Sequence, residues 1–321
     1  MVAYTGIQGQ NILIVSSDPA NPTEGQIWYN STTNLLKGYQ FAAVNAWASG
    51  GNLGTAGHGV GVGSGGTQTE AVAVGGTNRL TSTEEYNGSV WTAGGGLGTG
   101  RYACGVAGTQ TATAAFGGKN PTPANTAVTE EYNGTSWGPG GTMGTARYAL
   151  AGAGTQTAAL GFGGFIPPFS NATEEYDGTS WTTGGNLNTA RQQVAGAGIQ
   201  TAGLAFGGSP PTASTELYNG STWTAGNNLN TARSGLAGSG TQTAGLAFGG
   251  TSTIITTATE LYNGSTWTAT TAMTSARTNL GGTGSQTASV AFGGRNPNAT
   301  SLSLTEEWTG STLQTKTITS S

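Results

Sequence analysis

The sequence predicts an all-β fold of the β-propeller class, a ring of small four-stranded sheets, and two periodic features carry this prediction. A Gly-Gly pair recurs six times along the chain, at steps of 42 to 46 residues. A Tyr or Trp follows each pair, and in five of the six units a Trp comes five positions after the Tyr. One Gly-Gly and one Trp in a unit of this length are typical of propeller blades. We therefore expect a six-bladed β-propeller.

The first part of the chain lies outside this repeat. Residues 1–37 lack the periodic glycines, whereas the repeat occupies residues 38–321. Within the first segment, apolar and β-branched runs predict strands at 11–15, 26–29 and 35–39, with a turn at 30–34 between the last two. We expect a short N-terminal β-hairpin with an extended segment, followed by the propeller domain.

Each repeat then reads as four strands in order. An AGAG-type segment forms the first strand, and GTQ or GSQ turns the chain into the second strand, TAGLAF, which ends at the Gly-Gly. The third strand, TELY or TEEY, ends in Asn-Gly or Asp-Gly, the dipeptides best suited to tight hairpins. The fourth strand carries the Trp. Small residues suit the crowded strands near the axis, and Trp and Tyr are expected to fill the wider space between blades.

Closure of the ring has two possible solutions. The sixth unit has Leu313 where the other units have Trp, and Trp47 precedes the first unit without a blade of its own. A strand at 42–48 would complete the sixth blade in one solution. In the other, a strand at 312–319 completes it and the Trp47 strand packs elsewhere.

Composition argues against several functional classes. The net charge is −4 and no run of Lys or Arg occurs, so nucleic-acid binding is not expected. Cys104 and His58 are the single Cys and the single His, which argues against disulfides and against Cys- or His-based metal and redox sites. The apolar run at 12–15 is too short to cross a membrane. We expect no cofactor and no membrane insertion.

Enzymatic activity is not expected either. Nearly all the Arg, Tyr and Glu residues of interest repeat with the period of the blades, and equivalent positions on different blades lie far apart. Two carboxylates with unequal roles, as a glycosidase requires, are difficult to place together under these conditions.

The periodic arginines have two interpretations. An Arg opens five successive units, and Glu precedes the Tyr or Trp of each unit. In the first interpretation each Arg pairs with a third-strand Glu and joins one blade to another. In the second, the guanidinium groups surround the mouth of the channel and bind an anionic ligand. The arginines are Arg101, Arg147, Arg191, Arg233 and Arg277.

The connections between the second and third strands are the variable part of the repeat. In an up-and-down blade they lie at the same end as the arginines. They carry Arg79, Lys119, Phe165, Phe169 and Arg295. Charged and aromatic residues on variable loops of a uniform scaffold predict a recognition face. The alternative is that these loops only tolerate sequence drift.

Two resemblances add to this reading. Gly-Gly after an apolar strand, then an acidic residue with Tyr, a turn, a Trp and an Arg, resembles the kelch repeat from about residue 39 onward. That resemblance implies a propeller that binds macromolecules. The segment PTEGQIWYNSTTNLLKGY resembles an element near the N-termini of bacteriophage tail-fibre and virion proteins. It implies attachment to the particle, with Trp28, Tyr29 and Leu36 as candidate attachment residues.

From these features we expect a non-enzymatic phage virion protein of the tail-fibre or receptor-binding type. Its partners would be other virion proteins and a host-surface glycan or protein, and it would be located on the particle. A purely structural capsid-decoration, tail or baseplate component is the second hypothesis, and a glycan-cleaving enzyme is the third.

Overall fold

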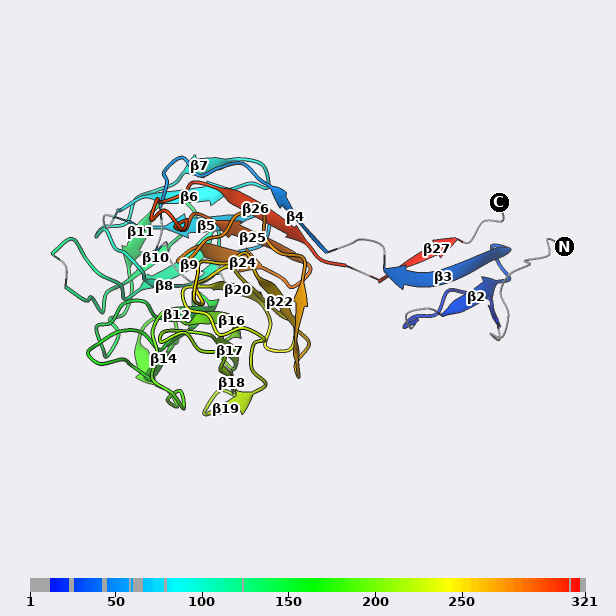
Figure 1. The fold of residues 1–321 in the computed structure, drawn as a ribbon. Helices are drawn as coiled ribbons and strands as arrows, with labels where there is room; N and C mark the ends of the chain where they lie inside the picture. Colours follow the sequence, from blue (N-terminus) through cyan, green and yellow to red (C-terminus); the bar gives the residue numbers. More distant parts are fainter. Residues whose placement is uncertain are drawn as a thin grey trace. The chain divides into compact units, whose positions relative to one another are not determined.

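The computed structural model describes residues 12–22, 26–41, 45–57, 59, 66–77, 80–122, 124–311 and 313–317. The described residues form strands joined by turns and contain no helix. They make up seven sheets, one more than the number of Gly-Gly units. The chain divides into a terminal unit, Met1–Asn45 with Thr309–Ser321, and a propeller unit, Ala46–Trp308 (Figure 1).

The terminal unit is a four-stranded sheet that uses both ends of the chain. Its order is β1 (Leu13–Val15), β2 (Ile27–Asn30), β3 (Leu35–Phe41) and β27 (Leu313–Thr317). β1 runs parallel to β2, and the β2–β3 hairpin lies close to the bounds predicted from the sequence. β27 pairs antiparallel with β3 from Leu313 opposite Phe41 to Thr317 opposite Lys37. The unit therefore differs from the expected 1–37 segment, because the last strand of the chain belongs to it.

Asp18 is the polar centre of the terminal unit. Its carboxylate accepts hydrogen bonds from the Trp28 indole at 3.1 Å and the Asn30 amide at 2.8 Å, and it forms an ion pair with Lys37 at 2.6 Å. The hydrogen bond from Lys37, followed by those from Asn30 and Trp28, lowers the pKa of Asp18 to about 2. These bonds tie the segment before β2 to both strands of the hairpin.

The propeller unit contains the other six sheets. Neighbouring strands follow one another in sequence order in five of these sheets, whereas the last sheet takes β4 (Ala46–Ser49), from before the first sheet, as its fourth strand. Sheet 1 is β5 (Ala71–Val74), β6 (Thr83–Tyr86) and β7 (Trp91–Ala93); sheet 2 is β8 (Gly105–Thr109), β9 (Ala112–Phe116), β10 (Thr129–Tyr132) and β11 (Trp137–Pro139); sheet 3 is β12 (Ala151–Thr155), β13 (Ala158–Phe162), β14 (Thr173–Tyr176) and β15 (Trp181–Thr183). Sheet 4 is β16 (Ala195–Ile199), β17 (Ala202–Phe206), β18 (Thr215–Tyr218) and β19 (Trp223–Gly226); sheet 5 is β20 (Ala237–Gly240), β21 (Gly245–Phe248), β22 (Thr259–Tyr262) and β23 (Trp267–Thr270); sheet 6 is β24 (Gly281–Gly284), β25 (Ala288–Phe292), β26 (Thr305–Thr309) and β4 (Ala46–Ser49).

Sheet 6 answers the question of closure. Its fourth strand is β4, which carries Trp47, so the first of the two predicted solutions is the one observed. The strand that begins at Leu313 pairs with β3 in the terminal unit instead. The first and last segments of the propeller unit thus share one sheet, which joins the ends of the repeat.

Tryptophan joins each sheet to its neighbour. The indole N–H in the outer strand of each sheet donates to the hydroxyl of a Thr in the preceding sheet, in the strand next to the outer one, at 2.8–3.1 Å. The six pairs are Trp91–Thr305, Trp137–Thr83, Trp181–Thr129, Trp223–Thr173, Trp267–Thr215 and Trp47–Thr259. Because Trp91 of sheet 1 reaches Thr305 of sheet 6, the row of sheets closes on itself.

The same junctions explain why glycine recurs in the first strands. Phe206, at the end of β17, packs against Trp267 of the next sheet with ring centroids 4.9 Å apart. A Cβ atom at Gly238 of β20 would lie 2.4 Å from the Phe206 ring, and one at Gly196 would lie 2.8 Å from the Phe162 ring. The phenyl groups therefore occupy the space that a side chain on the inner strand would need.

A glutamine in the first hairpin of every sheet forms the third inter-sheet contact. Each Gln side-chain amide donates to two backbone carbonyl groups of the preceding sheet, at 2.6–3.2 Å. Gln200, for example, bonds Ala159 and Tyr176. The sequence pattern placed this Gln in a turn and did not identify the contact. The other members are Gln68, Gln110, Gln156, Gln242 and Gln286.

Within the described residues, no helix has the length and apolar character that crossing a membrane would require.

We predict that Gln200→Ala lowers the free energy of unfolding by about 1–3 kcal/mol, because it leaves two part-buried carbonyl groups without a donor. The measurement is urea-induced unfolding followed by tryptophan fluorescence. Thr201→Ala is the matched control, because the adjacent Thr201 is exposed. Equal midpoints for the two variants would contradict the role assigned to Gln200.

A second prediction concerns acid stability of the terminal unit. The folded pKa of Asp18, about 2, lies below its ordinary value of 3.8, so its stabilising contribution is present above pH 3.8 and is lost as the pH falls toward 2. The NMR signal of the Trp28 indole N–H, followed against pH, should report a transition centred near pH 2. Asp18→Asn should abolish this transition, and a midpoint close to the ordinary carboxyl value would refute the assignment.

Candidate functional site

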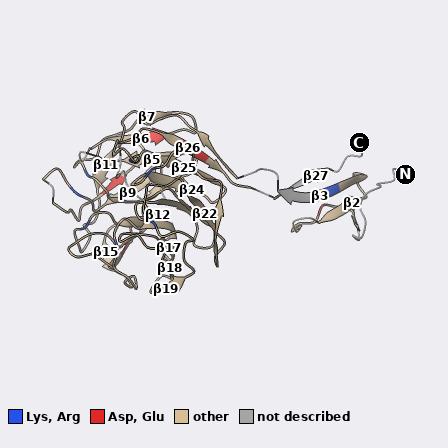
Figure 2. Ribbon diagram, viewed as in Figure 1, with Lys and Arg blue, Asp and Glu red and all other residues tan. Residues whose placement is uncertain are grey.

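The five periodic arginines are buried. Their side chains are at most 1 % exposed, and each pairs with the first Glu of the third strand in its own sheet. The pairs are Arg101–Glu130, Arg147–Glu174, Arg191–Glu216, Arg233–Glu260 and Arg277–Glu306; in the last four the nitrogen and oxygen are 2.5–3.0 Å apart. Charged residues are otherwise sparse along the ribbon (Figure 2).

The same carboxylates also hold the connection that leads into each sheet. In all six sheets the Glu accepts a backbone N–H from the segment that precedes the first strand, at 2.5–2.7 Å. Arg233, for example, also donates to the carbonyl groups of Gly249 and Ala258 beside its bond to Glu260. Burial lowers the pKa of Arg233, and the charge of Glu260 opposes that shift.

These contacts decide between the two interpretations of the arginines. The guanidinium groups are enclosed by carboxylates and carbonyl oxygens, so they do not form an exposed ring for an anionic ligand. The ion pair, however, lies within one sheet and its incoming connection, whereas we had expected it to join two blades. A desolvated guanidinium needs a carboxylate at this distance, and the nearest one belongs to the same repeat.

Two residues beyond each arginine position, the backbone forms a closed ring around the axis of the unit. Each residue in the ring donates its N–H to the carbonyl group of its counterpart in the preceding sheet, at 2.7–3.1 Å. All six have φ between 52° and 60°, in the left-handed region. The members are Gly59, Ala103, Ala149, Gln193, Gly235 and Asn279. Four of them are not glycine, and such a conformation in non-glycine residues is concentrated at functional sites.

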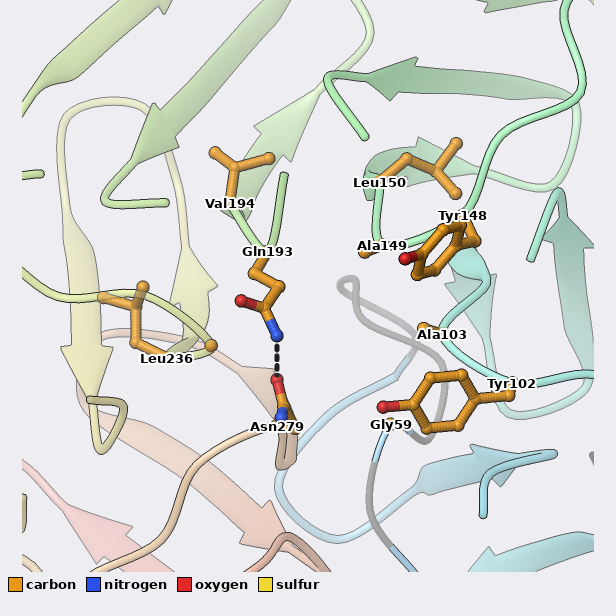
Figure 3. Close-up of a pocket in the computed structure, with 11 residues that line it drawn as sticks. Gly59, Tyr102, Ala103, Tyr148, Ala149, Leu150, Gln193, Val194, Leu236 and Asn279 are labelled. Carbon is orange, nitrogen blue, oxygen red and sulfur yellow. Dashed lines mark hydrogen bonds between the residues drawn. The ribbon is translucent and has the colours of Figure 1, made fainter. Parts of the chain in front are cut away.

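A cavity lies at this ring. Its volume is about 40 Å³, enough for about three water molecules. Tyr102 and Tyr148 line it together with Gln193 and Asn279, whose side chains are joined by a 3.0 Å hydrogen bond (Figure 3). The Tyr102 ring lies directly against Gly59, where a Cβ atom would be 2.2 Å away, so glycine is required there.

The cavity combines two aromatic rings with two planar amides. Aromatic faces offer apolar contact area, and the phenol and amide groups offer both donors and acceptors. Among the described residues, no group of three or more His, Cys, Asp or Glu is arranged to hold a metal ion. Leu150, Val194 and Leu236 also line the cavity, so it offers apolar contact together with a few hydrogen-bonding groups.

Three of the five loop residues predicted from the sequence pair with residues at or next to this cavity. Lys119 and Phe165 pair through the backbone with Tyr102 and Tyr148, and Arg295 pairs with Thr278, so the three occupy equivalent positions in sheets 2, 3 and 6. The Lys119 ammonium lies 4.2 Å from the centre of the Tyr148 ring, and Phe165 is 5.4 Å from it.

Phe169 packs edge-on against Phe165, with ring centroids 5.7 Å apart. Lys119, Tyr148, Phe165 and Phe169 therefore form a continuous half-buried cluster, which we call the aromatic rim. Arg79 and His58 lie outside the described residues.

Sequence reasoning missed the four polar or aromatic side chains among those that line the cavity. Tyr follows the repeated Arg only at Tyr102 and Tyr148, and Gln193 and Asn279 stand where other repeats have Gly or Ala, so no regular pattern marks them. A usable signal was their place one or two residues after the repeated Arg, where side chains begin to differ between repeats.

The candidate attachment residues are mostly internal to the terminal sheet. Trp28 is fully buried and Leu36 is 1 % exposed. Tyr29 is partly exposed and donates from its hydroxyl to Asn34 at 2.9 Å. Trp28 and Leu36 therefore support the sheet, and their side chains do not offer a surface to another protein.

Comparison with known proteins shows the fold. No family model matches the chain, and no curated protein matches it in sequence. A solved structure described as "Structure of YjhT" covers 83 % of this chain and 100 % of its own, with a TM-score of 0.69 and 12 % sequence identity. At this identity the likeness concerns the fold alone. Together with the repeated antiparallel four-stranded sheets, it identifies the fold of the chain as a β-propeller.

Proposed function

We propose that the protein is a non-enzymatic recognition component of a bacteriophage particle. In this proposal its six sheets are the blades of a kelch-like propeller that binds a host-surface glycan. The observation that carries it is the cavity at the axis, where Tyr102, Tyr148, Gln193 and Asn279 come from four different sheet entrances. Side chains that differ between repeats converge on this place, on a backbone ring that is nearly uniform.

A carbohydrate suits this chemistry better than an ionic ligand. Sugars present apolar C–H faces that pack on aromatic rings and hydroxyl groups that bond to planar amides. The cavity of about 40 Å³ admits one protruding substituent, and the aromatic rim would contact the neighbouring part of the sugar. The guanidinium groups of the repeat are already paired with Glu, so they are not offered to an acidic ligand.

The terminal unit supports attachment through a different surface from the one expected. Leu13 and Ile14 of the edge strand β1 are 50 % and 71 % exposed, and Leu35 is 39 % exposed. Apolar side chains on an edge strand favour pairing with another chain. We propose that this edge contacts other proteins of the particle. The resemblance of the neighbouring segment, residues 22–39, to virion proteins supports this proposal.

The test is binding of the full chain to an array of bacterial surface polysaccharides, followed by titration of the best binder. Tyr148→Ala and Asn279→Ala should each weaken binding about tenfold, the loss of about 1.4 kcal/mol of contact. Thr201→Ala, at an exposed hairpin of another part of the unit, should bind as the original protein does.

Two results would contradict the proposal. One is the absence of binding to any polysaccharide, which would favour the purely structural role. The other is equal affinity in the Tyr148 variant and the control. Release of reducing ends from the polysaccharide would instead favour the enzymatic hypothesis.

A further inference from the structure

Sheet 1 lacks the arginine that enters each of the other five sheets. Gly57 occupies its place, and the backbone shows the equivalence. The carbonyl oxygen of Gly57 accepts from Gly294 N–H at 2.8 Å, as that of Arg101 accepts from Gly76 N–H at 2.9 Å. The N–H of Gly57 likewise donates to Leu302, as that of Arg101 donates to Leu80.

The acidic partner of the missing arginine is nevertheless present. Glu84 of β6 is 9 % exposed and accepts the N–H groups of Gly54 and Thr55 at 2.6 and 3.0 Å. Glu130 accepts the equivalent N–H groups of Gly98 and Thr99, in addition to Arg101. Among the described residues, no Lys or Arg lies within ion-pair distance of Glu84.

A cavity occupies the position of the missing side chain. Gly57, Ala73, Gly75, Ser82 and Glu84 are among the residues that line it. Its volume is about 10 Å³, room for about one water molecule, so a larger group enters only when the lining moves apart. Ala73, Gly75 and Ser82 correspond to the residues of sheet 2 whose carbonyl groups accept hydrogen bonds from Arg101, namely Ala115, Gly117 and Val128.

We propose that this cavity, the sheet 1 slot, is a binding site for a guanidinium group from outside the propeller unit. A buried carboxylate without a counter-ion is unfavourable, and a planar group with several N–H donors matches a carboxylate flanked by carbonyl oxygens. The other five sheets hold this group in the same framework. The source is either a small guanidinium compound or an arginine side chain of a partner protein. The slot is independent of the proposed glycan site.

The experiment measures the thermal unfolding midpoint of the full chain in low millimolar guanidinium chloride, with sodium chloride at equal ionic strength as reference. Occupation of the slot should raise the midpoint by about 2 °C. Glu84→Gln should abolish the rise. Gly57→Arg should raise the midpoint by itself and remove the response, because the slot is then filled from within.

Arg233→Gly is the matched positive control, because it opens an equivalent slot at Glu260 in sheet 5. Its midpoint should fall and should partly recover in guanidinium. This variant keeps the proposal testable if Gly57→Arg fails to fold.

The source is distinguished by repeating the titration with N-acetyl-L-arginine amide. A response to both compounds assigns the slot to an arginine side chain, and a response to guanidinium alone assigns it to a small compound. No response in the original protein, or an equal response in Glu84→Gln, would overturn the proposal. So would a response that appears only in Arg79→Ala, since Arg79 of this chain would then be the occupant.

Discussion

The hydrogen bond from a tryptophan indole to a threonine hydroxyl in the preceding sheet is the contact on which the propeller unit depends. It occurs at all six junctions, and the indole that makes it packs on aromatic side chains between two sheets. A four-stranded sheet of this size cannot bury its faces alone, so each sheet is stable only between two neighbours. The bond between Trp91 and Thr305 joins the first sheet to the last, as do the bonds from Gln68 to Ser289 and Trp308.

The strand that closes the ring, β4, directly follows the terminal hairpin in the sequence, and the strand after β26 returns to that hairpin. β4 completes sheet 6, so the chain enters the propeller unit on the outer strand of the last sheet and leaves it from the neighbouring strand, β26. The first and last strands of the propeller unit are therefore neighbours in one sheet. That proximity allows β27 to pair with β3, and it explains why the terminal sheet needs both the beginning and the end of the sequence.

The candidate site and the sheet 1 slot both arise where a repeat departs from its own pattern. At the axis the framework is uniform, with the same left-handed backbone and the same amide ring, while the side chains differ between sheets. In sheet 1 the framework is again the same, but Gly57 replaces arginine and leaves Glu84 in place. In both places the repeated backbone contacts are kept while a side chain differs.

Much of the fold could be read from the sequence. The spacing of Gly-Gly and Trp, the turn dipeptides and the hairpin at 26–39 each depend on local chemistry, and they predicted the strands and their order. The site could be predicted only in part. Lys119 and Phe165 were found because their loops vary, whereas Gln193 and Asn279 resemble ordinary polar residues until the backbone ring brings them together.

The sequence by itself determined the repeating sheet and the residues that could fill the space between sheets, because these follow from periodicity and residue type. The tertiary structure alone decided which strand closes the ring, how deeply the arginines are buried, and that Glu84 has no Lys or Arg beside it among the described residues. These features depend on groups from opposite ends of the chain meeting in space, as Trp47 meets Thr259 and Gly57 meets Gly294. A short stretch of sequence does not indicate which distant residues will come into contact.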